Sequence, residues 1–147
     1  MTDLNSIAES LNEALGDKIA GVAMARGELT VELNAANVLD AISWLHGPGD
    51  FKILVDLCGT DWPQREKRFD VVYHLLSLTK NARIRVKVQV GEGETIASIT
   101  PVYPAAGWFE REAFDMYGIA FDNHPDLRRI LTDYGFSGFP LRKDFPL

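Results

Sequence analysis

Strict alternation of apolar and polar residues near the middle of the chain is the feature that most constrains its fold. Residues 83–90 read RIRVKVQV, so every second side chain is apolar and the others are charged or polar. Successive side chains of a strand point to opposite faces of a sheet, so this run predicts a strand with one buried and one solvated face. The apolar segment 69–78 precedes it, and Thr79 to Asn81 link the two. We therefore predict an antiparallel hairpin.

Apolar spacing and turn residues predict the elements on either side of this hairpin. The segment 51–61 is strongly apolar, which favours a central strand. A short helical or strand segment is expected near residues 94–100. The other predicted elements are helices over residues 4–15, 36–46 and about 107–117, and strands over residues 19–24 and 29–33. Together they predict an α+β fold with a mixed or antiparallel sheet of four to five strands, two N-terminal helices and one late helix, followed by an irregular C-terminal strap.

The last forty-one residues, 107–147, differ in character from the rest of the chain. A charged helical turn is followed by an irregular run in which Pro, Gly, Arg and aromatic residues alternate, whereas disordered segments are poor in aromatics. These apolar side chains must be buried, either by this domain folding back over them or by another protein. With 147 residues, enough for one domain, we predict an α+β domain over 1–117 and an extended C-terminal interaction segment over 118–147.

Charge and hydropathy exclude several classes of partner. The formal net charge of −6 argues against broad binding to nucleic acid or anionic lipid. No apolar run is long enough to span a membrane, and the N-terminus lacks the pattern of a signal peptide. The single cysteine, Cys58, is expected to exclude an intrachain disulfide and any cysteine-ligated iron–sulfur or zinc site formed by this chain alone. Cys58 is expected to be a small buried apolar residue of a cytosolic protein.

No motif for a cofactor or metal is present in the sequence. The run 91–95, GEGET, lacks the third glycine of a dinucleotide fingerprint and the Gly-Lys-Ser/Thr of a P-loop, so a loop turn is the better interpretation. The three histidines, His46, His74 and His124, are far apart and match no metal-binding spacing. We therefore predict no cofactor-binding residue and no metal ligand in this chain.

Carboxylates gather on the predicted helix at 107–117. Glu112 and Asp115 are three residues apart, so a general acid–base pair is formally possible. No nucleophile, oxyanion donor or second base stands nearby in the sequence to complete such a site, so we predict no catalytic residue. Arg111 and Asp115 are four apart, which predicts a stabilising ion pair on the helix surface.

Basic residues near the C-terminus favour a role in protein–protein contact. Arg128 and Arg129 follow Asp126-Leu127, and Arg142-Lys143 precede Asp144-Phe145. Arginine and aromatic residues are enriched at the centres of protein interfaces, and a guanidinium can bridge carboxylates of two subunits. The predicted subunit-interface residues are Glu110, Arg111, Asp115, His124, Asp126, Arg128, Arg129, Tyr134, Phe139, Arg142, Lys143 and Phe145.

The same C-terminal residues resemble a known family. Residues 108–147, WFEREAFDMYGIAFDNHPDLRRILTDYGFSGFPLRKDFPL, are similar to the signature of the C subunit of bacterial complex I, the homologue of the mitochondrial thirty-kilodalton subunit. Residues 1–106 match this family more loosely, in the order of their helices and strands and in the segment 56–63. Members of the family commonly continue beyond the position of Leu147, so we expect the interface carried by this sequence to be incomplete.

The resemblance implies a cofactor-free structural subunit in the peripheral arm of NADH:quinone oxidoreductase. It implies contacts with the large hydrogenase-like D subunit and with the iron–sulfur B and I subunits, on the cytoplasmic side of the bacterial inner membrane. The FMN and the iron–sulfur clusters would lie in partner subunits. Two alternatives stay open: the equivalent subunit of a related membrane-bound hydrogenase or dehydrogenase complex, and, remotely, a stand-alone enzyme that uses a carboxylate.

Overall fold

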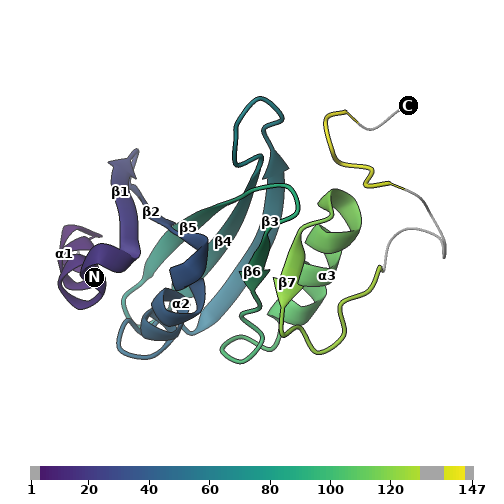
Figure 1. Cartoon of the computed structure of the whole chain (residues 1–147). Coiled ribbons are helices and arrows are strands. Elements are labelled where there is room, and N and C mark those ends of the chain that lie inside the picture. The colour runs from purple at the N-terminus through teal and green to yellow at the C-terminus, as the bar shows by residue number, and fades with distance from the viewer. Residues whose placement is uncertain (1–3, 130–137, 145–147) are drawn as a thin grey trace.

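The computed structural model describes residues 4–129 and 138–144. It has the predicted α+β architecture (Figure 1). Short 3₁₀ turns, Gly16–Lys18 and Ala35–Asn37, precede β1 and α2. The helices are α1 (Leu4–Leu15), α2 (Val38–His46) and α3 (Ala106–Tyr117), and the strands are β1 (Ile19–Ala25), β2 (Glu28–Leu33), β3 (Ile53–Asp61), β4 (Phe69–Ser77), β5 (Ala82–Val90), β6 (Thr95–Ala97) and β7 (Ala120–Asp122).

Five strands of the described residues form one mixed sheet in the order β1-β2-β5-β4-β3. The predicted hairpin is confirmed as β4 and β5, which pair antiparallel with Tyr73 opposite Val86. Asn81, with φ 50°, closes the turn between them. β2 pairs parallel with β5, whereas the other neighbouring strands of this sheet pair antiparallel. The β1–β2 hairpin is therefore attached to the β3–β4–β5 meander through the middle of the sheet.

The position predicted for residues 51–61 is wrong, because β3 is an edge strand. Its hydrophobic side chains divide between two faces. Leu54 and Leu57 join the core, while Ile53 and Val55 on the other face are 37% and 42% exposed. β3 therefore carries apolar residues on both of its faces although only one of its edges pairs with another strand of this sheet. Figure 1 shows α3 lying on the far side of β3 from the rest of the sheet.

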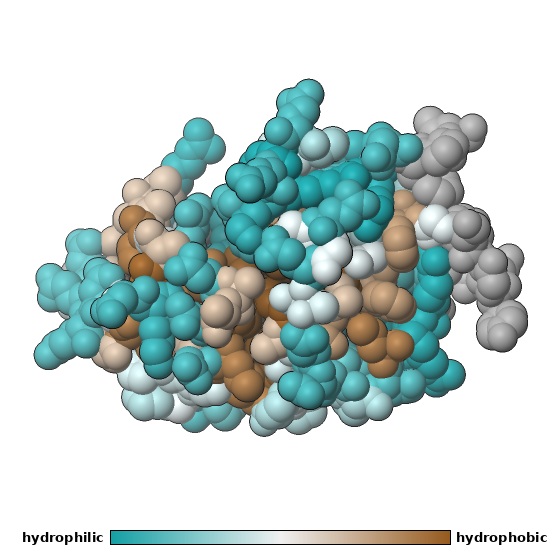
Figure 2. Space-filling model, in the orientation of Figure 1, coloured by the Kyte–Doolittle hydropathy of each residue, from teal (hydrophilic) through white to brown (hydrophobic). Residues whose placement is uncertain are grey.

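The core lies on one face of the sheet and includes side chains from all three helices. Figure 1 shows α1 beside β1 and α3 beside β3, with α2 between them. The apolar spacing predicted for α1 is reflected in the burial of Ile7, Leu11 and Leu15. Tyr73 and Phe51 are among the largest side chains that are fully buried. Figure 2 shows that most of this side of the molecule is polar, with apolar side chains gathered near its middle.

A second, two-stranded sheet joins the late part of the chain to the core. β6 pairs parallel with β7, with Ile96 opposite Phe121. The strand alternative for the segment near 94–100 is therefore confirmed for 95–97. Ile119 and Phe121 are buried in the main core, so the first residues of the segment 118–147 pack with the domain. Among the helices of the described residues, none combines the length and the apolarity needed to span a membrane.

Candidate subunit interface

The end of α3 contacts residues 138–144, a described part of the C-terminal strap. Gly118 has φ 78°, the left-handed conformation that ends many helices, and its N–H donates to the carbonyl of Phe114. A Cβ on Gly118 would lie 2.8 Å from Nη2 of Arg142 and 2.8 Å from the ring of Phe139. Glycine is thus required at this position both by the backbone conformation and by the close approach of residues 138–144.

Residues 138–144 are hydrogen-bonded to the end of α3. The N–H of Leu141 donates to the carbonyl of Met116 over 3.0 Å. The guanidinium of Arg142 donates through Nε to the carbonyl of Tyr117 over 2.7 Å. These carbonyls belong to the last turn of α3, where no N–H of the helix is available to donate to them. The strap therefore supplies hydrogen bonds that these carbonyls would otherwise need from water.

A buried ion pair at the β3–β4 connection forms the centre of this contact. Asp61 is the last residue of β3, and Arg68 directly precedes β4. Arg68 binds Asp61 with two hydrogen bonds, Nε–Oδ1 of 2.6 Å and Nη2–Oδ2 of 2.9 Å. The strap adds two contacts: Asp144 accepts from Nη2 of Arg68 over 2.7 Å, and the N–H of Lys143 donates to Asp61 over 2.7 Å. Hydrogen bonding to Arg68 lowers the pKa of Asp61 below its ordinary value.

Glu92 and two phenylalanine rings complete the environment of Arg142. Glu92 accepts from Arg68 at 3.3 Å and from Arg142 at 3.0 Å, so one carboxylate bridges two guanidinium groups. The guanidinium carbon of Arg142 lies 4.5 Å from the ring centre of Phe139 and 5.1 Å from that of Phe69. A cation over an aromatic face is favourable, by about 0.5–1 kcal/mol at exposed sites and more when desolvated.

A second arginine joins α3 to the strap. The guanidinium of Arg129 hydrogen-bonds through Nε to the side chain of Asp115, which is fully buried. Nη2 of Arg129 also reaches the carbonyls of Asp115, over 2.9 Å, and of Gly138, over 2.5 Å. The predicted i, i+4 pair of Arg111 with Asp115 is therefore wrong, because the buried face of α3 directs Asp115 toward Arg129. We call the set formed by Asp61, Arg68, Glu92, Asp115, Arg129, Phe139 and Arg142 the C-terminal clamp.

A separate polar network is buried near the middle of α3. Glu110 accepts hydrogen bonds from Oγ of Ser98, over 2.6 Å, and from the N–H of Ile99, over 2.9 Å. Nδ1 of His124 accepts from the N–H of Asp126, so Nε2 carries the proton and donates to the carbonyl of Gly107 over 2.9 Å. Burial raises the pKa of Glu110. This network fastens the residues after β6 and after β7 to α3.

The remaining predicted interface residues lie at the surface or outside the described residues. Arg111 stacks over the exposed ring of Trp108, 5.6 Å from its centre, and donates to the carbonyl of Arg128. Arg128 pairs with Asp126 at 3.0 Å, and both side chains are well exposed. Tyr134 and Phe145 fall outside the residues that the structure describes.

Sequence reasoning missed Asp61, Arg68 and Glu92. Asp61 and Arg68 are seven residues apart, but their other partners are distant along the chain, and Lys143 lies 82 positions from Asp61. One local signal was available for Asp61. It shares the inward face of β3 with Leu57 and Gly59, and a carboxylate on an inward-facing position requires a buried partner.

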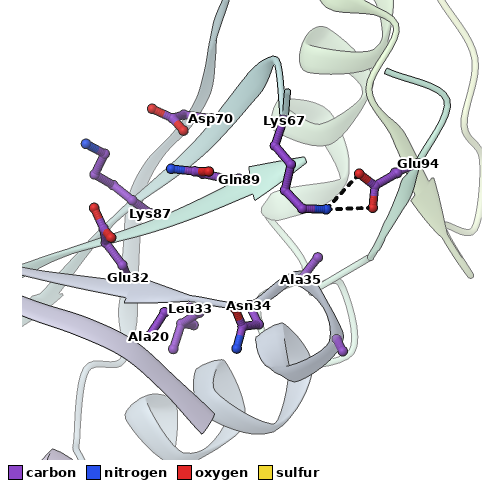
Figure 3. A pocket seen from close by; sticks show the side chains of 11 residues that line it. Ala20, Glu32, Leu33, Asn34, Ala35, Lys67, Asp70, Lys87, Gln89 and Glu94 are labelled. Carbon is purple, nitrogen blue, oxygen red and sulfur yellow. Dashed lines mark hydrogen bonds and ion pairs between the residues drawn. The ribbon is translucent and has the colours of Figure 1, made fainter. Parts of the chain in front are cut away.

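Two hollows on the domain are lined by none of the clamp residues. One, of about 530 Å³, is lined by the side chains shown in Figure 3, where an ion pair of 2.8 Å joins Lys67 to Glu94. Positive and negative groups are interspersed around it, so they do not converge on one ligand charge. The acids of α3 line neither this hollow nor the second, of about 830 Å³. Glu112 of the possible acid–base pair is exposed, whereas Asp115 is buried and hydrogen-bonded to Arg129.

Comparison with known proteins defines the family. Residues 31–147 match the family described as "Respiratory-chain NADH dehydrogenase, 30 Kd subunit". The chain belongs to this family. The matched range includes every residue of the clamp, and it extends over both β4 and β5. The resemblance found in the sequence is therefore confirmed.

Two bacterial relatives are named for the same enzyme. The chain is 57% identical over 146 residues to the C subunit of NADH-quinone oxidoreductase from Sinorhizobium medicae, covering 98% of this chain and 73% of that protein. It is 60% identical over 131 residues to the C subunit of NADH-quinone oxidoreductase from Caulobacter vibrioides, covering 88% of this chain and 66% of that protein.

A solved structure shares the fold at lower identity. A chain of the membrane-bound sulfane sulfur reductase, described as an archaeal respiratory membrane complex, matches with a TM-score of 0.82 and 23% identity. The match covers 97% of this chain and 85% of that chain. At this identity the likeness shows a common fold, in agreement with the thirty-kilodalton-subunit family.

Proposed function

We propose that this chain is a structural subunit of proton-translocating NADH:quinone oxidoreductase, complex I. The observation that carries the proposal is the 57% identity, over 98% of the chain, to a protein named as the C subunit of that enzyme. In this proposal the subunit carries no redox group, and the FMN and iron–sulfur clusters lie in partner subunits. It sits in the peripheral arm, on the cytoplasmic side of the bacterial inner membrane.

The segment 118–147 is proposed to contact the large D subunit, with the iron–sulfur B and I subunits nearby. The geometry supports two different roles for its residues, contact with the chain's own domain and contact with a partner. Clamp residues such as Arg142 bind the chain's own domain and hold the strap in one orientation. The strap then presents Leu141, which is 50% exposed, close to the β3–β4 connection, where Trp62 is 52% exposed. Exposed aliphatic and aromatic side chains on a fixed backbone are suitable anchors for a partner.

Co-purification from native membranes tests this proposal. We expect the tagged wild-type chain to retain the D subunit and the combined Arg128→Ala and Arg142→Ala variant to lose it. Leu141→Ser should weaken recovery of the D subunit, since its side chain would face the partner. Leu78→Ser is the matched control, because Leu78 is 73% exposed and lies at the β4–β5 turn, away from the strap.

The outcomes separate the proposed function from the proposed surface. If the wild-type chain recovers no other component of complex I, the functional assignment is wrong. If the wild type recovers the D subunit and the double variant recovers it equally well, the assignment of the interface to the strap is wrong. Co-purification with a nickel hydrogenase subunit in place of flavin-binding subunits would favour the related membrane-bound hydrogenase.

A further inference from the structure

Three side chains capable of binding a metal lie together on the face of the sheet opposite the core. Asp56 and Cys58 belong to β3, and His74 belongs to β4 directly opposite Asp56. One ligand atom from each side chain lies within 4.8 Å of the others, and all three residues are half-buried. Sequence spacing did not reveal this group, because eighteen positions separate Asp56 from His74 and the strand register brings them together.

These side chains have no polar partner among the residues that the structure describes. Two other charged residues of this face, Asp70 and Arg85, are paired: Arg65 binds Asp70 at 2.7 Å, and Arg85 binds Glu28 at 3.1 Å. Asp56, Cys58 and His74, by contrast, form no side-chain hydrogen bond or ion pair within residues 4–129 and 138–144. A thiol, an imidazole and a carboxylate that lie this close together offer one metal ion three ligands of kinds that proteins use.

We propose that Asp56, Cys58 and His74 bind Zn²⁺ or a divalent cation of similar preference. Sulfur, nitrogen and oxygen are the three ligand types that zinc accepts, whereas Ca²⁺ and Mg²⁺ are held by oxygen ligands. Bond lengths of about 2.0–2.3 Å place tetrahedral zinc ligands about 3.5 Å apart. The ligand atoms now lie within 4.8 Å of one another. Side-chain rotations that bring them about 1 Å closer together would therefore give the spacing that a tetrahedral zinc ion requires.

Three protein ligands leave a fourth coordination position for water or another small ligand. Asp56 and His74 line the second hollow, of about 830 Å³, so an ion can reach the site from solvent. The surrounding charges are mixed. Asp56 and Glu112 place negative charge near the Cys58 sulfur, and Arg85 places positive charge near it. Glu28 pairs with Arg85 and partly neutralises it.

Cobalt substitution in the purified chain tests the site directly, because Co²⁺ reports its own ligands spectroscopically. We expect one Co²⁺ per chain, with a thiolate-to-cobalt charge-transfer band and intense visible bands typical of tetrahedral coordination. Zn²⁺ should displace the ion stoichiometrically. Cys58→Ser should abolish the charge-transfer band, and Asp56→Asn and His74→Asn should each weaken Zn²⁺ binding by about tenfold or more, since each removes a ligand.

Matched controls address adventitious binding and folding. His46 lies edge-on to Tyr103 and Asp40 pairs with Lys18, so His46→Asn and Asp40→Asn should leave the dissociation constant unchanged. Cys58→Ser is nearly isosteric, and its circular dichroism should match that of the wild type. The proposal is overturned if the wild type shows no charge-transfer band, or if Cys58→Ser binds Zn²⁺ as tightly as the wild type. Equal weakening in the controls would identify an adventitious ion only, which also overturns it.

Discussion

Replacing Arg68 by alanine should destabilise the domain more than any change to an exposed charge. The guanidinium of Arg68 holds Asp61 with two hydrogen bonds of 2.6 and 2.9 Å. The side chain of Asp61 is fully buried, so it cannot turn to solvent when Arg68 is removed. Its remaining hydrogen bond comes from the N–H of Lys143, which belongs to the strap that Arg68 itself helps to hold.

The expected loss can be estimated from this geometry. Removing one member of a buried ion pair costs about 3–5 kcal/mol, because the other charge is left buried without compensation. The bond from Lys143 remains and Asp61 can take up a proton, so we expect a loss of about 3 kcal/mol at neutral pH. A domain of ordinary stability, about 5–15 kcal/mol, remains folded after such a loss.

The pH dependence of stability gives an independent check. Arg68 lowers the pKa of Asp61 in the folded state, so the unfolded chain binds more protons between the lowered and the ordinary pKa. The pair therefore stabilises the fold above the ordinary pKa of an aspartate, and this contribution is lost as the pH falls through the lowered value. The difference between wild type and Arg68→Ala should be largest at neutral pH and should shrink in acid.

The coupling between Arg68 and Asp61 can be measured by urea denaturation. The assay compares the wild type with Arg68→Ala, with Asp61→Asn and with the variant that carries both substitutions. We expect a coupling free energy of about 1–3 kcal/mol, within the range for residues in direct contact. Arg83→Ala is the matched control, since Arg83 is exposed and its loss should change stability by less than about 0.5 kcal/mol. Additive losses, or an Arg68→Ala penalty that is the same at acid and neutral pH, would refute the reasoning.

Three further substitutions test other parts of the structure by the same denaturation assay. Gly118→Ala should cost about 1–2 kcal/mol from its left-handed backbone alone, and more because the new Cβ displaces Arg142; an unchanged midpoint would contradict this. Tyr73→Phe should be neutral or stabilising, by up to about 1 kcal/mol, because the buried hydroxyl has no partner among the described residues; a clear loss would indicate a bound water. Glu110→Gln should cost about 1 kcal/mol in the bonds from Ser98 and Ile99. Burial raises the pKa of Glu110, so wild-type stability falls as pH rises from the ordinary to the raised value, and the glutamine variant should lack that fall.

Local patterns predicted the parts of the fold that are stabilised locally. Alternation in 83–90 identified β5 and its buried face, because burial on one side of a strand imposes a period of two. The neighbours of each strand could not be predicted in the same way, and β3 was assigned to the centre although it lies at the edge. Its apolar outer face carries Ile53 and Val55 at the surface, so hydrophobicity there does not measure the number of neighbouring strands.

Electrostatic pairing was predicted least well, for a physical reason. Helical spacing suggested that Arg111 would pair with Asp115, since residues four apart are neighbours on a helix surface. Asp115, however, lies on the buried face of α3, where an unpaired carboxylate is costly, and Arg129 reaches it after the chain has turned back. Which distant arginine approaches a buried acid depends on the path of the whole chain, and no local spacing records that path.

The clamp changes how substitutions in the C-terminal residues should be interpreted. Arginine and aromatic residues there first suggested contact with another subunit, yet Arg129 and Arg142 are bound to this chain's own carboxylates, carbonyls and phenylalanine rings. Losing either one should therefore lower the stability of the isolated chain as well as its assembly. Leu141 and Arg128 are exposed, so their loss should affect assembly alone. Denaturation and co-purification of both pairs of variants therefore distinguish two roles. Residues that hold the strap against the domain should affect both measurements, whereas residues that contact the partner should affect co-purification alone.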